Sequence, residues 1–141
     1  MRIVLDTSVL VAATRSKQGA SYVLVSGLPH PAYQICLSVT LYMEWQDVLS
    51  RAEHLPPTQT PAKARQFLRY LASIAHLQDV YFLWRPFLRD PADDMVLELA
   101  VAANARFIVT HNIRDFERAS TFGIQAITPG DFLEQYVKNK I

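Results

Sequence analysis

Carboxylates stand at four separated places in this 141-residue chain, each beside a segment that looks buried. They are Asp6, Glu44, the pair Asp93-Asp94, and Asp115. Carboxylates brought close together repel one another, and each holds a raised pKa unless a cation neutralises them. Oxygen ligands suit Mg²⁺ or Mn²⁺, and one or two such ions can activate hydroxide for attack on a phosphate. If the fold gathers these acids, they predict metal-assisted phosphoryl transfer.

The first acid stands at the end of a predicted strand. Residues 2–5 form an apolar run typical of a buried strand, and the run ends on Asp6. Thr7 and Ser8 are suited to cap the helix that the following apolar residues predict. A carboxylate at the end of a buried strand needs a partner for its charge, so Asp6 is difficult to explain as a purely structural residue.

Glu44 lies on the helix expected after a second strand, residues 33–37. Ser38 is a good N-cap for that helix, and Glu44 shares a helical stripe with the apolar Leu41 and Trp45. A surface glutamate more often falls on the polar side of a helix. Glu44 is therefore a candidate for the same site, although its side chain could also reach solvent past the apolar stripe.

The acid pair should open a helix, and Asp115 should follow the next strand. Asp90-Pro91 ends the preceding segment, and apolar spacing predicts a helix from near Asp93 to about Asn104. Residues 107–109 read as a short buried strand that runs into polar residues. In a parallel sheet, strand ends and the starts of crossover helices share one edge. Taken alone, these acids would more often serve the helix dipole or a cap, but their conjunction favours a site.

The remaining segments alternate between helix and strand. We expect helices at 9–13, 20–28, 61–75 and 129–137, a short helical turn after residue 116, and further strands at 80–84 and 124–127, with a loop at 54–60. Alternation of this kind predicts an α/β fold. Residues 1–141 are expected to form a single domain with four to five short parallel strands, helices on both faces and right-handed crossovers.

Composition narrows the class of protein. Half of the residues are hydrophobic, 19% are charged and the formal net charge is +1, so the chain is globular and its charge argues neither for nor against nucleic acid. One cysteine, Cys36, excludes an internal disulfide and fits a reducing compartment. No apolar segment approaches transmembrane length, so we expect a cytoplasmic protein without membrane association. No pair of Cys or His stands at zinc-ligand spacing.

Four motifs carry a family resemblance. They are IVLDTS at residues 3–8, Glu44 within SVTLYMEWQDVL, DPADD before LELA, and FIVTHNIRDF at residues 107–116. Together and in this order they resemble the PIN-domain nucleases, especially the VapC-like toxins of bacterial toxin–antitoxin pairs. The resemblance covers essentially the whole chain. It implies a Rossmann-like sheet, Mg²⁺- or Mn²⁺-dependent endoribonuclease activity, a homodimer, and a small antitoxin that covers the acidic pocket.

The resemblance also assigns residues. The catalytic and metal-binding quartet corresponds to Asp6, Glu44, Asp94 and Asp115. Supporting positions correspond to Thr110 and Asn112, and to Thr7 or Ser8 beside the first acid. Asn112 stands where many relatives have aspartate, so Asp115 must supply the fourth carboxylate. Asp93 adjoins Asp94 and could exchange roles with it, whereas His111 is expected to be an exposed loop residue rather than a base.

Partner surfaces and other functions stay open at this stage. Cations in loops or at helix ends could guide single-stranded RNA or simply be solvated: Arg15, Lys17, Arg51, Arg89 and Arg114. The basic side of helix 61–75 is expected only to face water, and apolar residues 22–25 could form a dimer or antitoxin interface. An aspartyl-phosphate phosphotransferase would need a second aspartate where Ser8 stands. A non-catalytic binding module is the other alternative, although unpaired buried acids cost stability.

Overall fold

The computed structural model describes residues 1–51, 59–81 and 87–138, and within them five parallel strands form one sheet in the order β3-β2-β1-β4-β5. The strands are β1 (Arg2–Leu5), β2 (Gln34–Leu37), β3 (His76–Leu77), β4 (Phe107–Val109) and β5 (Gln125–Ile127). β1 pairs with β2 on one side and β4 on the other. The central strand therefore leads directly to Asp6, and its neighbour leads to Thr110.

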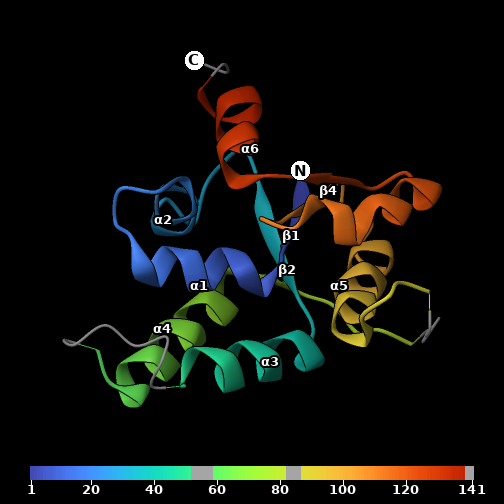
Figure 1. The fold of residues 1–141 in the computed structure, drawn as a ribbon. Helices are drawn as coiled ribbons and strands as arrows, with labels where there is room; N and C mark the ends of the chain where they lie inside the picture. Colours follow the sequence, from blue (N-terminus) through green and yellow to red (C-terminus); the bar gives the residue numbers. More distant parts are fainter. Residues whose placement is uncertain (52–58, 82–86, 139–141) are drawn as a thin grey trace.

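Helices cover both faces of this sheet, as predicted. They are α1 (Thr7–Arg15), α2 (Ala20–Ser26), α3 (Val39–Leu49), α4 (Pro61–Ile74), α5 (Pro91–Ala102), the 3₁₀ segment η2 (Ile113–Phe122) and α6 (Pro129–Tyr136). In Figure 1, α1 and α2 lie on one side of the strands and α5 lies on the other. The chain adds β2 and β3 in one direction from β1, and β4 and β5 in the opposite direction. Right-handed crossovers then place the two sets of helices on opposite faces.

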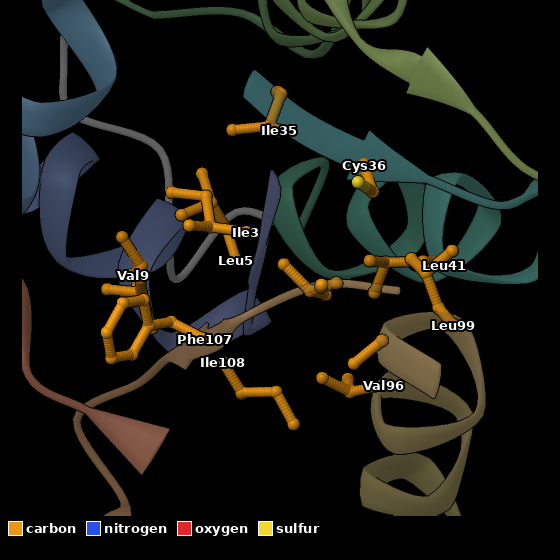
Figure 2. Packing of buried hydrophobic residues seen from close by; sticks show 14 of the residues in the cluster. Ile3, Leu5, Val9, Ile35, Cys36, Leu41, Val96, Leu99, Phe107 and Ile108 are labelled. Carbon is orange, nitrogen blue, oxygen red and sulfur yellow. The ribbon is translucent and has the colours of Figure 1, made fainter. Parts of the chain in front are cut away.

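The core follows from the alternation of side chains along each strand. Figure 2 shows Ile3 and Phe107 on the side of Val9 from α1, whereas Ile108 points to the side of Val96 from α5. All five side chains are almost completely buried. Burial of each contributes roughly 1.5–3 kcal/mol to folding. Because both faces are covered, β1 and β2 are apolar after their first residue and β4 is apolar throughout. Polar residues follow β1 and β4 directly, at Asp6 and Thr110.

Three predicted helix starts are confirmed. The hydroxyls of Ser38, Thr60 and Thr128 each accept the backbone N–H of the residue three positions later, at 3.2 Å in each case. A proline at the first helical position follows the cap in α4 and α6. The caps thus fix where α3, which carries Glu44, and these two helices begin.

Two helix starts differ from expectation. Asp6, not Thr7 or Ser8, is the N-cap residue of α1, and no side chain caps that helix. Helix α5 begins at Pro91 instead of near Asp93, because Asp90 caps it and proline suits the first helical position. The hydroxyls of Thr7 and Ser8 are therefore left to bond the acids, and Asp93 and Asp94 both lie in the first turn of α5, as predicted.

The third strand was predicted in the wrong place. It was expected at residues 80–84, but β3 is the short pair His76–Leu77, which lies beside Cys36 and Leu37 of β2. Val80 and Tyr81 have no regular structure, and residues 82–84 lie outside the described residues, as does most of the predicted loop at 54–60. The apolar and aromatic run at 80–84 has strand propensity, but pairing with β2 decides the strand and uses residues directly after α4. No helix within the described ranges is long and apolar enough to cross a membrane.

Candidate active site

Asp6 is held by two hydroxyl groups at the end of the central strand. Its Oδ2 accepts hydrogen bonds from Ser8 Oγ and Thr110 Oγ1, both at 2.8 Å, and the residue is only 8% exposed. Its Oδ1 has no hydrogen-bond partner in the part of the chain that the structure describes. The carboxylate is therefore fixed through one oxygen, and the other is uncommitted. Ser8 and Thr110, both predicted supporting residues, are brought to it from α1 and from the end of β4.

Glu44 lies near Asp6 and is held by the remaining hydroxyl of the first motif. Thr7 Oγ1 donates a hydrogen bond to Glu44 Oε2. Burial raises the pKa of Glu44, the bond from Thr7 opposes that rise, and the charges of Asp6, Asp90 and Asp47 add to it. The prediction that Glu44 would share a site with Asp6 is thus supported by their electrostatic coupling.

Asp93 lies among the acids at the start of α5. Its pKa is raised to about 7, first by burial and then by the charges of four carboxylates, Asp6, Asp90, Asp115 and Glu44. These four come from the end of β1, α3, the cap of α5 and η2, so the structure gathers acids from across the chain. Asp6, Glu44, Asp90, Asp93 and Asp115 together form a group that we name the acid cluster.

Asp94 does something different from its neighbour. It is only 2% exposed, and its carboxylate accepts the backbone N–H of Leu88 at 2.7 Å and that of Phe87 at 3.3 Å. Its charge is not among those that raise the pKa of Glu44 or Asp93. Asp94 therefore holds the backbone that leads into α5, and the geometry favours Asp93 as the member of the acid cluster.

Asp90 is a member of the acid cluster that the sequence analysis missed. It was read only as the end of a segment, but its Oδ1 accepts the N–H of Ala92 at 3.0 Å and its charge raises the pKa of both Glu44 and Asp93. The available signal was spacing, because residues three or four apart on a helix lie on the same face. Asp90 stands three residues before Asp93 and four before Asp94, so this spacing could have placed Asp90 beside the acid pair.

The segment after β4 is tied to both the acid cluster and α2. His111 donates its backbone N–H to Ser8 Oγ at 3.2 Å, and its Nε2 lies 2.7 Å from Oγ of the buried Ser21. Asn112 donates its N–H to Thr110 Oγ1 at 2.9 Å. His111 is an exposed residue, as predicted, and its ring is bonded to α2. Asp115 follows on the exposed first turn of η2 and couples to Asp93.

The acid cluster fits a divalent cation by its chemistry, although its side chains are not converged. No three Asp, Glu, His or Cys side chains within residues 1–51, 59–81 and 87–138 lie close enough together to hold a metal ion as they stand. The donors are all carboxylate oxygens, which suit Mg²⁺ or Mn²⁺, and the charges of neighbouring acids raise the pKa of Glu44 and Asp93. No Lys or Arg of these ranges forms an ion pair with them. Rotation of the exposed side chains is needed to complete a metal site.

The predicted cationic path is divided among separate places. Arg51 is ion-paired with Asp47 at 2.8 Å, and Arg15 and Lys17 line a groove between α1, α2 and α4. Arg89 and Arg114 line a pocket that they share with Asp115. Only the last two therefore lie beside the acid cluster.

The predicted apolar interface at residues 22–25 is mostly core. Leu24 and Val25 are buried, whereas Val23 is 49% exposed. The sequence prediction was wrong for the two buried residues, because α2 packs against α1 and α6 and these residues are covered.

A family model for the PIN domain matches residues 2–114 of the chain. The chain belongs to the PIN domain family. The predicted family is thereby confirmed, and the match includes the whole acid cluster except Asp115, the next residue. No curated protein matches the sequence.

Two solved structures share the fold. One is VapBC-1 from nontypeable Haemophilus influenzae, with a TM-score of 0.63 and 18% identity over 92% of this chain and 99% of that one. The other is VapBC2 from Rickettsia felis bound to a DNA fragment from its promoter, with a TM-score of 0.61 and 19% identity over 89% and 98%. At 18% and 19% identity, these similarities show that this protein shares the fold of those chains.

Proposed function

We propose that this PIN domain is a Mg²⁺- or Mn²⁺-dependent endoribonuclease. The observation that carries the proposal is the acid cluster, in which burial and mutual repulsion raise the pKa of Asp93 to about 7 and raise that of Glu44. A cation bound among these groups favours their ionised form near neutral pH, and carboxylate oxygens suit a hard divalent ion.

The acids and the hydroxyls of the site would have separate roles. Asp6, Glu44, Asp93 and Asp115 would hold one or two ions, with Asp90 beside them. Such an ion supplies hydroxide as the nucleophile and stabilises the leaving oxygen of a phosphodiester. Thr110 and Ser8 orient Asp6, and Thr7 orients Glu44, through the hydrogen bonds described above. His111 is tied to Ser21, so we assign it no role as a base.

We further propose that the protein is the toxin of a toxin–antitoxin pair. The motif resemblance to VapC-like toxins supports this, and so do the two VapBC structures named above, which are similar to this chain in fold. A cognate antitoxin and a homodimer are the expected partners, in the cytoplasm. A protein that sediments as a monomer at working concentration would contradict the homodimer.

The test is cleavage of a mixed RNA pool by purified protein with Mn²⁺ or Mg²⁺, and with EDTA. Asp6→Asn keeps the shape of the side chain and removes one charge, so it should abolish cutting. Glu134→Gln is the matched control, because Glu134 is an exposed acid on α6 paired with Lys138. Equal cutting by Asp6→Asn and the unsubstituted protein would refute the assignment.

One observation favours a second candidate, a non-catalytic PIN binding module: no three acids of the described residues converge as they stand. Thermal melting separates the two. A nuclease should show a higher unfolding midpoint with Mg²⁺ or Mn²⁺, because an ion bound only by the folded state stabilises it. An unchanged midpoint, together with no cutting, would favour the module.

A further inference from the structure

A pocket opens beside the acid cluster, and three arginines line it. The pocket has a volume of about 430 Å³, and its lining includes Arg89, Arg114 and Arg118 together with Asp115 and Glu117. Asp115 belongs to the acid cluster and also lines this pocket. The pocket is therefore continuous with the proposed site of cleavage, and its lining carries one more positive than negative charge.

Two of these arginines, Arg89 and Arg114, have no ion-pair partner among the residues that the structure describes. Arg89 directly precedes Asp90, and Arg114 directly precedes Asp115, so each stands next to an acid in the chain. Both residues are exposed, and neither forms an ion pair or side-chain hydrogen bond with any residue that the structure describes. A ligand that reaches the acid cluster would thus meet two free guanidinium groups beside it.

The third arginine lies over an aromatic ring. The guanidinium carbon of Arg118 lies 4.0 Å from the centroid of the Phe87 ring, and its Nη1 donates to the Phe87 carbonyl. Phe87 in turn contacts the edge of Phe122, with centroids 5.3 Å apart, and its N–H is accepted by Asp94. This wall of the pocket is a fixed, exposed guanidinium plane, a surface on which nucleobases stack.

We propose that this pocket is the subsite for one nucleotide of single-stranded RNA, next to the phosphodiester at the acid cluster. Arg89 and Arg114 contact phosphate oxygens, and the base stacks on the plane of Arg118. The volume lies in the range of ordinary ligand pockets, roughly 300–1,000 Å³. An acidic peptide would use the two free charges but gain nothing from the stacking plane. The inference rests on the proposed nuclease function.

The test measures RNA binding by proteins that carry Asp6→Asn, in the presence of Mg²⁺. This substitution is expected to abolish cutting, so the RNA stays intact during the titration. A short fluorescein-labelled oligouridine is titrated at several salt concentrations and followed by anisotropy. Arg89→Ala and Arg114→Ala should each weaken binding roughly 5- to 10-fold and reduce the salt slope by about one. Arg65→Ala is the matched control, since Arg65 is exposed on α4 and does not line the pocket, and it should bind as the parent does.

The stacking role of Arg118 is tested separately, by comparing two ligands. Arg118→Lys keeps the charge and removes the plane, so it should weaken binding of oligouridine but not of an abasic ribose-phosphate chain of the same length. A melting curve for Arg118→Lys checks that the fold is retained. Equal loss for both ligands would overturn the stacking assignment.

The remaining outcomes separate the two proposals. If Arg89→Ala and Arg114→Ala bind RNA as the parent does, or Arg65→Ala loses as much affinity, the subsite is refuted. If these variants lose binding of labelled poly-glutamate but not of RNA, the pocket takes an acidic peptide instead. In each of these cases the unsubstituted protein still cuts RNA with Mg²⁺ or Mn²⁺. If instead the nuclease proposal is wrong, the unsubstituted protein cuts no RNA.

Discussion

Replacing a carboxylate by an amide at two adjacent positions of α5 should change the stability of the protein in opposite directions. Asp93→Asn and Asp94→Asn remove the same charge from neighbouring residues in the first turn of the helix. The structure places Asp93 among repelling carboxylates and Asp94 against two backbone N–H groups. We therefore expect the first substitution to stabilise the metal-free protein near pH 8 and the second to destabilise it.

The magnitude for Asp94 follows from its hydrogen bonds. Its carboxylate accepts from two N–H donors, whereas an asparagine offers one acceptor and would turn an amide N–H₂ toward the other donor. A buried donor left without an acceptor costs about 1–3 kcal/mol. For a chain of this length, that lowers the unfolding midpoint by roughly 3–10 °C.

The magnitude for Asp93 follows from its titration. Its pKa is about 7 in the folded protein against an ordinary value of 3.8, so between these pH values the folded state keeps a proton that the unfolded state has lost. Stability contributed by this group is therefore present below about pH 4 and falls as the pH rises to about 7. Allowing for screening by solvent at this partly exposed side chain, Asp93→Asn should gain about 1 kcal/mol at pH 8 and nothing at pH 4.

The assay is thermal unfolding of both variants and the unsubstituted protein in EDTA from pH 4 to pH 8, with Glu134→Gln as the control. A second series adds Mg²⁺ at pH 8, which should raise the midpoint of the unsubstituted protein and of Asp94→Asn more than that of Asp93→Asn. The reasoning is refuted if Asp94→Asn is the variant that gains stability in EDTA and loses the response to Mg²⁺.

Three further predictions concern single side chains of the site and the core. Glu44→Gln should raise the unfolding midpoint at pH 8 in EDTA and reduce its response to Mg²⁺, because the pKa of Glu44 is also raised by burial and nearby acids; an unchanged response would exclude it from the metal site. Ser21→Ala and His111→Ala remove the same 2.7 Å contact, so the double variant should cost no more than either single one, about 0.5–1.5 kcal/mol in urea unfolding, and additive costs would contradict the bond. Burial raises the pKa of the Cys36 thiol to about 11, so a disulfide reagent at pH 8 should react only as fast as the protein opens, and immediate reaction would show an exposed thiol.

The sequence was sufficient to predict the ends of strands and the starts of capped helices. Apolar runs locate β1 and β4, and the polar residues after them lie together because parallel strands end at one edge. The caps Ser38 and Thr60 were predictable because a hydroxyl three residues before a free N–H is a local feature. Local chemistry of this kind needs no knowledge of the rest of the fold.

What the sequence could not decide depends on contacts between distant segments. Asp93 and Asp94 are adjacent and differ by about 100° around the helix axis, so the facing residue depends on how α5 is rotated against the sheet. Strand β3 was missed because pairing with β2, not the strand propensity of residues 80–84, selects His76–Leu77. Asp90 was overlooked because its cap role explains it locally, whereas its coupling to Glu44 exists only in the fold.

The first turn of α5 joins the two halves of the proposed site. Asp90 and Asp93 contribute to the acid cluster, while Asp94 holds the backbone of Phe87, whose ring supports Arg118 in the pocket. Consecutive carboxylates thus serve different purposes: one adds charge that only a cation can balance, and the next fixes a wall that binds no metal. Because both depend on the same helix turn, the distance between the acid cluster and the pocket is set by rigid backbone. That is the arrangement required to hold one nucleotide while its neighbouring phosphodiester is cut.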